Sequence, residues 1–418
     1  MLPVRFSMIL AAAGTLISGL HAQQQFELDC NLDPLVNIPA CWDLTPDKLE
    51  KTFAKEDFKK NPYFKWLTNN RDRAIFMRRP YSNLSINLTM FGGEVPVEEV
   101  VVDFVDGKIN GLSVSIYNRG DSSAEFTKEE FDRRFKISGK EIAKRLDVRP
   151  FPRKPNPAQG MLTSGWTWIS GTGMAVVEHN PEVDDGTFEF LRMRLMRRDA
   201  KGAMAAAMQS RSGAAVRLSD LPRNVIRDKV GNTVIEGIPM VDQGMKGYCV
   251  VASAQRLFEY YGIPCDQHQL AQIAEADAER GTSSLAMSQA LGKIDHRFKT
   301  RFKTVAALYG RGTLYKPNRD MSAGKRFDRS DFLKDVKDYV DDGIPLLWSL
   351  QLGHAPEEPA ISPQAAGGHM RMIIGNKEAE YRIVFTHSWG AGHEKKRMKI
   401  GDAYSVTQGL FVMHPTTR

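Results

Sequence analysis

Apolar residues recur at intervals of three and four along several parts of the chain, which is the spacing of one buried helix face. Two of these stretches begin directly after a threonine, Thr45 or Thr127, whose hydroxyl can cap the first turn. Another ends at Gly262, and Pro264 follows, a pair that stops a helix. The pattern predicts helices at residues 46–58, 128–146, 249–261, 266–280 and 330–341.

Alternating apolar and polar residues mark a second set of segments, and this period of two is typical of half-buried strands. Asp106-Gly107 separates two of them and predicts a hairpin turn, and residues 376–380 form a polar turn between two others. Helices beside antiparallel strands predict the α+β fold class. The predicted strands are residues 84–90, 97–105, 109–117, 165–179, 187–198, 346–352, 369–375, 381–386 and 409–413.

The two halves of this pattern are separated by residues 199–215, which are rich in Ala, Met, Gly and Ser and keep no apolar face. Such a composition is typical of a linker. The chain has 418 residues, 42% of them hydrophobic, which is enough for two cores. We therefore expect a smaller α+β domain at residues 26–198 and a second domain at residues 216–418. The first has no catalytic spacing, and binding, inhibition and scaffolding all fit it.

The first 22 residues have the pattern of an export signal. Arg5 precedes an apolar run over residues 8–20, and Ala22 stands before a glutamine triplet. The run is shorter than the ~18 apolar residues that cross a membrane, and no later segment reaches that length. We predict a signal peptide at residues 1–22 and a secreted or periplasmic protein without a membrane span.

The charge of the chain adds two expectations about partners. A formal net charge of +7 suits a protein that associates with the anionic cell envelope. Acidic and basic residues are interspersed along the whole sequence, so nucleic-acid binding is not indicated.

Four cysteines fall into two pairs along the chain. Cys30 and Cys41 lie close in sequence, and an oxidising compartment predicts a disulfide between them. Cys265 follows a predicted helix end and is interpreted as a small buried hydrophobic residue. Cys249 begins a predicted helix, where unpaired N–H groups and the helix dipole favour a thiolate over a thiol. Cys249 is therefore the candidate nucleophile.

Three further side chains complete a candidate site. Gln243 lies six residues upstream of Cys249, and its amide can donate to an oxyanion together with the N–H of Cys249. His369 enters a predicted strand and is the candidate base. Counting outward from the polar turn places His369 opposite His387 or its neighbour Ser388, to within one residue of register. His387 is therefore the candidate group that orients His369.

These residues resemble the motifs of papain-like cysteine peptidases. The resemblance spans roughly residues 225–415 and is greatest to the bacterial double-glycine leader peptidases and their secreted relatives. It implies a papain-like fold for the second domain. The segments that carry the resemblance are the glutamine-to-cysteine motif in Gln243-Gly244 and Gly247-Tyr248-Cys249, the histidine motif in Gly367-Gly368-His369, and the Asn-Ser-Trp-Gly motif in His387-Ser388-Trp389-Gly390.

The sequence departs from this family at one position, because His387 stands where the family has asparagine or aspartate. A neutral imidazole can accept the N–H of His369, but a protonated one repels it. With an ordinary imidazole pKa of ~6.5, activity would fall at acid pH as His387 gains a proton. Ser388 and the loop at His393-Glu394 are alternative orienting groups.

Three functions fit these residues. The first is a secreted cysteine peptidase, without metal or cofactor, that cleaves a peptide or protein substrate. In it Cys249 attacks the carbonyl, His369 moves the proton and Gln243 holds the oxyanion. The second is a Cys-His-His amidase or endopeptidase of cell-wall peptidoglycan, against which the upstream glutamine argues. The third is a non-catalytic binding protein that keeps the fold.

Overall fold

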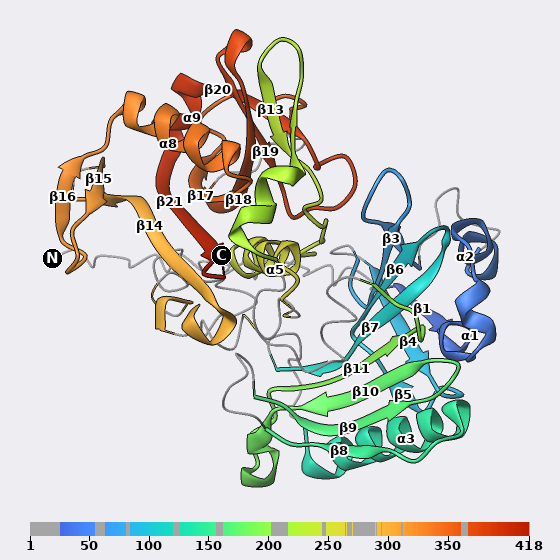
Figure 1. Ribbon diagram of the computed structural model, residues 1–418. Helices are drawn as coiled ribbons and strands as arrows, with labels where there is room; N and C mark the ends of the chain where they lie inside the picture. Colours follow the sequence, from blue (N-terminus) through green and yellow to red (C-terminus); the bar gives the residue numbers. More distant parts are fainter. Residues whose placement is uncertain are drawn as a thin grey trace, which may run out of the picture.

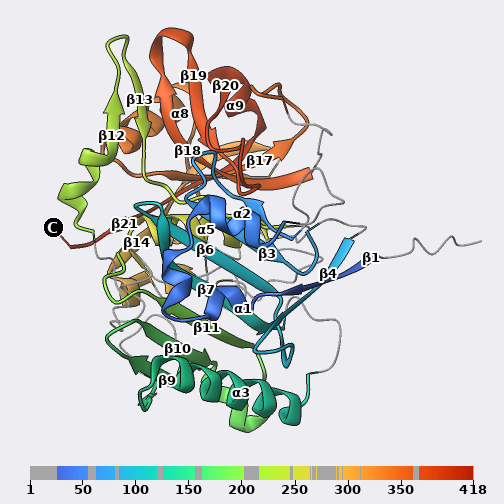
Figure 2. The same ribbon diagram turned by 90° about the vertical axis from the view of Figure 1, so that its right-hand side faces the viewer.

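A computed structural model shows two sheet-based halves that meet beside one buried helix, α5 (Figures 1 and 2). The predicted signal peptide, residues 202–215 of the predicted linker and nearly all of the predicted helix at 266–280 lie outside the described residues. The described residues are 26–54, 63–80, 84–119, 126–155, 162–201, 216–244, 248–263, 265, 270, 289, 291–293, 295–310, 312–360 and 367–417.

The N-terminal half is built on an eight-stranded antiparallel sheet with the order β2-β3-β6-β7-β11-β10-β9-β8. Helix α3 (Lys128–Leu146) packs on β9, β10 and β11, and Thr127 caps it as predicted. The short helix η2 (Pro181–Asp185) lies between β10 and β11 in the chain. The strands are β2 (Lys65–Trp66), β3 (Arg73–Met77), β6 (Glu99–Val105), β7 (Lys108–Asn118), β8 (Phe151–Arg153), β9 (Ser164–Ile169), β10 (Met174–His179) and β11 (Phe190–Met196).

A small three-stranded sheet and three short helical segments complete this half. Strand β1 (Phe26–Asn31) pairs in parallel with β4 (Leu84–Met90), and β4 pairs with β5 (Val95–Pro96). Thr45 accepts a hydrogen bond from the N–H of Lys48 and so caps α2 as predicted. The helical segments are α1 (Asp33–Val36), η1 (Ala40–Asp43) and α2 (Pro46–Thr52).

The predicted disulfide between Cys30 and Cys41 is not formed, because both residues are free thiols. Each is buried in the hydrophobic core of the N-terminal half. Burial raises the pKa of both thiols to about 12. These two cysteines therefore act as small core residues in this structure.

The C-terminal half is built on a ten-stranded sheet. Eight strands follow the order β12-β13-β18-β17-β21-β14-β15-β16, and β19 pairs with both β18 and β20. The strands are β12 (Val225–Arg227), β13 (Asn232–Ile235), β14 (Thr300–Tyr309), β15 (Thr313–Pro317), β16 (Ala323–Arg326), β17 (Leu346–Leu352), β18 (Gly367–Lys377), β19 (Arg382–Thr386), β20 (Lys396–Lys399) and β21 (Thr407–Pro415).

Helices pack against β18, the strand that contains His369. Helix α5 (Cys249–Tyr260) and helix α8 (Arg329–Asp341) both contact β18, and α9 (Ile400–Val406) packs on α8. Asp328 caps α8 with a complete capping box. Short 3₁₀ segments are η3 (Leu218–Asn224), η4 (Asp295–Phe298) and η5 (Glu378–Glu380).

The predicted α+β class is confirmed in outline, although sheet predominates over helix. The predicted strand at 165–179 is wrong as a single element, because a turn at 170–173 divides it into β9 and β10. In that turn the hydroxyl of Ser170 accepts the N–H groups of Thr172 and Gly173. The sequence pattern also missed β14–β16, whose many exposed and half-exposed residues blur the alternation.

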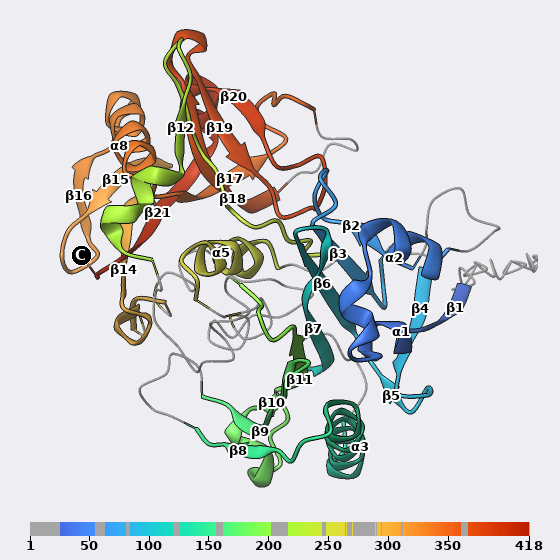
Figure 3. The ribbon, with the colours of Figure 1, turned by 45° about the vertical axis from the view of Figure 1, so that its right-hand side comes forward.

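The hairpin formed by β2 and β3 joins the two halves (Figure 3). Leu67, Ile75 and Met77 form a small buried cluster with Met240 of the C-terminal half. The guanidinium of Arg73 donates to the carboxylate of Glu259 on α5, with 2.7 Å between Nη1 and Oε2. The N-terminal half therefore packs directly against the helix that begins at Cys249 and against the segment that leads to it.

Candidate active site

Cys249 is the first residue of α5, as the sequence predicted. Tyr248, the residue before it, is fully buried, and nearly every residue of the helix after it is buried as well. Burial raises the pKa of the Cys249 thiol, and hydrogen bonds from the backbone N–H groups of Met370, Val250 and Cys249 oppose this rise without cancelling it. The predicted preference for a thiolate is therefore not found in the resting structure.

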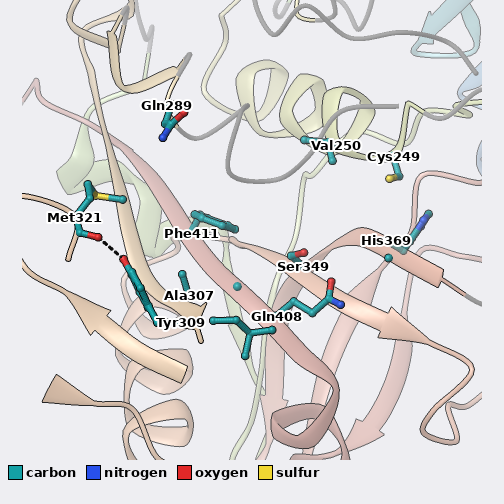
Figure 4. A pocket seen from close by; sticks show the side chains of 13 residues that line it. Cys249, Val250, Gln289, Ala307, Tyr309, Met321, Ser349, His369, Gln408 and Phe411 are labelled. Atoms are coloured by element: carbon teal, nitrogen blue, oxygen red, sulfur yellow. Dashed lines mark hydrogen bonds between the residues drawn. The ribbon is translucent and has the colours of Figure 1, made fainter. Parts of the chain in front are cut away.

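Strand β18 carries His369 to the same place. Helix α5 packs on this strand, and the hydroxyl of Ser253 donates to the carbonyl of Met370 across 3.4 Å. The thiol of Cys249 lies at the backbone N–H of Met370, the residue directly after His369. Figure 4 shows Cys249 and His369 on these facing elements at one end of a cavity. The structure thus brings the predicted nucleophile and base together.

The imidazole of His369 is buried, with 8% of its surface exposed. Burial, reinforced by the charge of Arg371, lowers its pKa to about 3, although Glu357 acts in the opposite direction. A raised thiol pKa and a lowered imidazole pKa mean that both groups are neutral near pH 7. The proton therefore stays on sulfur in the resting structure and can pass to His369 only as the sulfur attacks an electrophile.

Gln243 is held in place by the segment that follows β19. Its backbone N–H donates to the carbonyl of Ser388 across 2.9 Å, and its side-chain Oε1 accepts the hydroxyl of Ser388 across 2.7 Å. The neighbouring residue Asp242 forms a β-bridge with Trp389. Because the amide oxygen is engaged by Ser388, the NH₂ group is the part that can donate to an oxyanion. Ser388, an alternative orienting group in the sequence, instead contacts Gln243.

His387 lies beside His369, with 5.6 Å between their ring centroids. Trp389 stacks on His387 at 4.6 Å and also contacts His369 at 5.0 Å. Strand β18 pairs Met372 with Thr386. Continuing this register places His369 opposite Trp389, one residue beyond Ser388, which was the farther of the two predicted partners. The bulge next to Ile373 lies in this ladder. The predicted neighbourhood of the two histidines is confirmed.

The pKa of His387 is not near the ordinary imidazole value. Its side chain is fully buried, and burial lowers the pKa to about 2 despite a contact with Glu357 that raises it. The charges of Arg371 and His369 lower it further. The expectation that His387 gains a proton near pH 6.5 is therefore wrong for the folded protein.

Arg256, on the third turn of α5, fixes the helix to the strand of His387. Its guanidinium is buried and donates to the carbonyl of His387 at 2.6 Å and to the hydroxyl of Thr386 at 2.8 Å. It also donates to the carbonyl of Pro239 at 2.6 Å. One side chain on the nucleophile helix thus fastens both the His387 segment and the chain leading to Gln243. Sequence periodicity placed Arg256 in a helix and gave no signal for this contact.

A cavity of about 500 Å³ opens beside Cys249 and His369. Its described lining is mostly apolar and carries no acidic residue, lysine or arginine (Figure 4). The amide of Gln408 lies in the lining and donates to Gln351 across 2.8 Å. Cavities of this size and character are typical of binding sites for a side chain or small ligand. The other lining residues are Val250, Gln289, Ala307, Leu308, Tyr309, Met321, Ser349, Gly368, Gly409 and Phe411.

The described part of the chain holds neither a cluster of metal ligands nor a membrane-spanning helix. Its residues include no group of three or more His, Cys, Asp or Glu side chains that could hold a metal ion. Within the same residues, no helix is long and apolar enough to cross a membrane.

Comparison with known proteins gives one informative match. Residues 235–409 match the model of a family described as the Peptidase_C39 like family, and this segment contains Gln243, Cys249, His369 and His387. Among curated proteins, none matches this chain. One similar solved structure is xylellain, a cysteine protease from Xylella fastidiosa, at 13% identity and a TM-score of 0.29. That match covers 49% of this chain and 92% of xylellain, and its TM-score is too low to support the fold or function assigned here.

Proposed function

We propose that this chain is a secreted cysteine peptidase that hydrolyses peptide bonds in peptides or proteins. One observation carries the proposal: Cys249, at the start of α5, and His369, on β18, line the same cavity. The match of residues 235–409 to a peptidase family supports it. The export pattern at residues 1–22 supports secretion. Association with the cell envelope is a further part of the proposal.

The reaction begins when Cys249 Sγ attacks the peptide carbonyl while its proton passes to His369. The carbonyl oxygen gains negative charge and is held by the NH₂ of Gln243 and the backbone N–H of Cys249. His369 gives the proton to the leaving amine, the C–N bond breaks and a thioester remains on Cys249. Water then attacks the thioester, losing a proton to His369, and the acid product leaves as the thiol is restored.

The cavity supports a substrate with an apolar side chain next to the cleaved bond. Its described lining includes Leu308, Met321 and Phe411, and it has no charged group that would pair with an acidic or basic side chain. Burying one large apolar side chain is worth about 1.5–3 kcal/mol. This argues for a peptide substrate over the peptidoglycan alternative, whose stem peptides carry charged side chains.

The test is hydrolysis of a casein digest, followed by mass spectrometry of the products, for the wild type and for Cys249→Ala. We expect new peptide termini with the wild type and none with the variant. The matched control is Cys265→Ala, which removes another buried thiol of the same half and should keep turnover. Turnover that survived in Cys249→Ala, or no turnover by the correctly folded wild type, would contradict the proposal.

A further inference from the structure

A buried carboxylate, that of Glu357, lies beside His387. Glu357 comes from the loop between β17 and β18, and 7% of its side chain is exposed. Its Oε1 lies 3.6 Å from Nε2 of His387 and also forms an ion pair with Lys396. Its Oε2 lies 2.5 Å from Nη1 of Arg371. Glu357 therefore faces His387 and two buried cations at once.

The loop holds Glu357 in this place through its backbone. Glu358 forms a β-bridge with Arg397, in which each N–H donates to the other's carbonyl at 2.9 and 2.8 Å. The side chain of Glu358 is about half exposed and pairs with Arg382. Two adjacent glutamates thus have different surroundings, since one points into the protein and the other out of it.

The charges around His387 require its imidazole to be neutral. One carboxylate faces the cations of Arg371 and Lys396, whose side chains are 0% and 1% exposed. A third positive charge on His387 would be uncompensated in a buried site. The other titratable groups whose rings face it are His369 and His393, and burial lowers the pKa of both. His387 therefore carries one ring proton, and the nitrogen that holds it decides what the ring can do.

Three ring nitrogens of His369 and His387 lack hydrogen-bond partners in the part of the chain that the structure describes. Within the described residues, both ring nitrogens of His387 and Nε2 of His369 are buried and without a hydrogen-bond partner. An N–H on Nε2 of His369 and a lone pair on Nδ1 of His387, or the reverse, would satisfy both of these atoms. If Nε2 of His387 carries its proton, then Nδ1 is the acceptor and Nε2 of His369 is the donor. That leaves Nδ1 of His369 as the base.

We propose that Glu357 is a positioning residue that accepts the Nε2–H of His387 and so makes Nδ1 of His387 the acceptor for His369. The inference rests on the proposed function for its catalytic consequence. The order of groups becomes Cys249, His369, His387 and Glu357. The thiol proton moves to Nδ1 of His369 and on to the leaving amine, while His387 and Glu357 keep their protonation states throughout.

The activity test uses Glu357→Ala in two backgrounds, the wild type and His387→Asn. In the wild type we expect kcat to fall about 10–100-fold with KM unchanged, because His387 then populates the wrong tautomer. In His387→Asn we expect less than about a twofold change, since an amide has fixed donor and acceptor groups. Glu357→Gln keeps an acceptor oxygen and should restore most of kcat. The control is Glu358→Gln, which should behave as the wild type.

Equal losses of kcat in both backgrounds would overturn the proposal and leave Glu357 as a counterion of Arg371 and Lys396 only. A second readout is independent of turnover: ¹⁵N NMR of histidine-labelled protein, with the His387 signals assigned by their absence from His387→Asn. We expect the Nε2–H tautomer in the wild type and its loss in Glu357→Ala. A wild-type His387 protonated at Nδ1 would overturn the proposal. Because this measurement needs no substrate, it separates failure of the inference from failure of the proposed function.

Discussion

At the scale of single residues, the site is a set of neutral groups whose ionisation is suppressed by burial. Burial raises the pKa of Cys249 and lowers the pKa values of His369 and His387 to about 3 and about 2. A resting thiolate and imidazolium pair is therefore not what the structure holds. His369 stays unprotonated down to low pH, and proton transfer accompanies the attack on the carbonyl.

The lowered histidine pKa values also predict how stability depends on pH. Between the unfolded pKa of ~6.5 and the folded values, the unfolded state binds more protons, so stability falls as pH falls. From pH 7 to pH 5 each buried histidine should cost on the order of 1–2 kcal/mol of unfolding free energy. Urea unfolding of the wild type and His387→Asn at both pH values measures this cost.

The variant His387→Asn should lose the contribution of one buried histidine, on the order of 1–2 kcal/mol, because an asparagine at this position does not titrate, whereas His369, His393 and His179 still do. Glu357 should contribute little to the difference in pH dependence between the wild type and His387→Asn. Burial raises its pKa, but contacts with His387, Arg371 and Lys396 outweigh burial and lower the folded pKa to about 2 in the wild type. Arg371 and Lys396 remain beside Glu357 in the variant and favour its ionised form there as well. Identical pH dependence in the two proteins would show that His387 has the same pKa in the folded and unfolded states, and would contradict the lowered value.

The sequence identified these residues only in part. Cys249, Gln243 and His369 stand in recognisable local motifs, and the structure places Cys249 and His369 at one cavity. Glu357 had no such signal, because it lies in a loop without periodicity and its partners come from other strands. The pKa shifts were also beyond the sequence, since they depend on burial by residues distant in the chain.

At the scale of elements, helix α5 and strand β18 carry the chemistry, and the arm formed by β14, β15 and β16 borders the cavity. The sequence pattern predicted α5 and the central part of β18, which are runs of mostly apolar residues that the structure buries nearly throughout. It missed the arm, where only Leu314 of β15 and a few residues of β14 are buried. Exposed strands lack the alternation on which such a prediction depends.

We expect the arm to influence which peptide side chains the cavity accepts. Leu308 on β14 lines the cavity and is 39% exposed, so its replacement should not disturb the core. We expect Leu308→Asp to lower kcat/KM for peptides with large apolar side chains by about 10-fold, the effect of roughly 1.4 kcal/mol of lost apolar burial. Peptide-library profiling of the variant against the wild type measures the change.

A matched control for this variant is Leu333→Asp on helix α8, a residue of similar exposure that is absent from the described lining. It should keep the wild-type profile. A uniform loss of kcat/KM across all peptides in Leu308→Asp would point to damage to the fold. An unchanged profile would show that this cavity does not determine the preference for apolar side chains.

At the scale of the whole molecule, the N-terminal half is part of the framework around the site. The β2–β3 hairpin reaches α5 through Arg73 and Glu259, and Asn69 donates its backbone N–H to Glu394, in the loop after Trp389, across 3.2 Å. Lys65 lies 3.6 Å from Asp242, the neighbour of Gln243. The sequence separated two domains by composition, and it had no means to show that their surfaces meet.

These contacts predict that a nick between the halves will not separate them. Trypsin should cut within residues 197–215, where several arginines and lysines occur. We expect the two fragments to elute together in size-exclusion chromatography and to retain activity, because the buried cluster of Leu67, Ile75, Met77 and Met240 remains intact. Release of a stable fragment beginning near residue 216 would show that the halves are independent.

In the proposed reaction Cys249 forms a covalent acyl intermediate, which can be trapped and located in the chain. The protein is mixed with the p-nitrophenyl ester of a blocked phenylalanine, quenched in acid within one turnover, digested and mapped by mass spectrometry. We expect an acyl group on Cys249 in the wild type, and none at any position in Cys249→Ala. An acyl group on another residue, or equal labelling of Cys249→Ala, would contradict it.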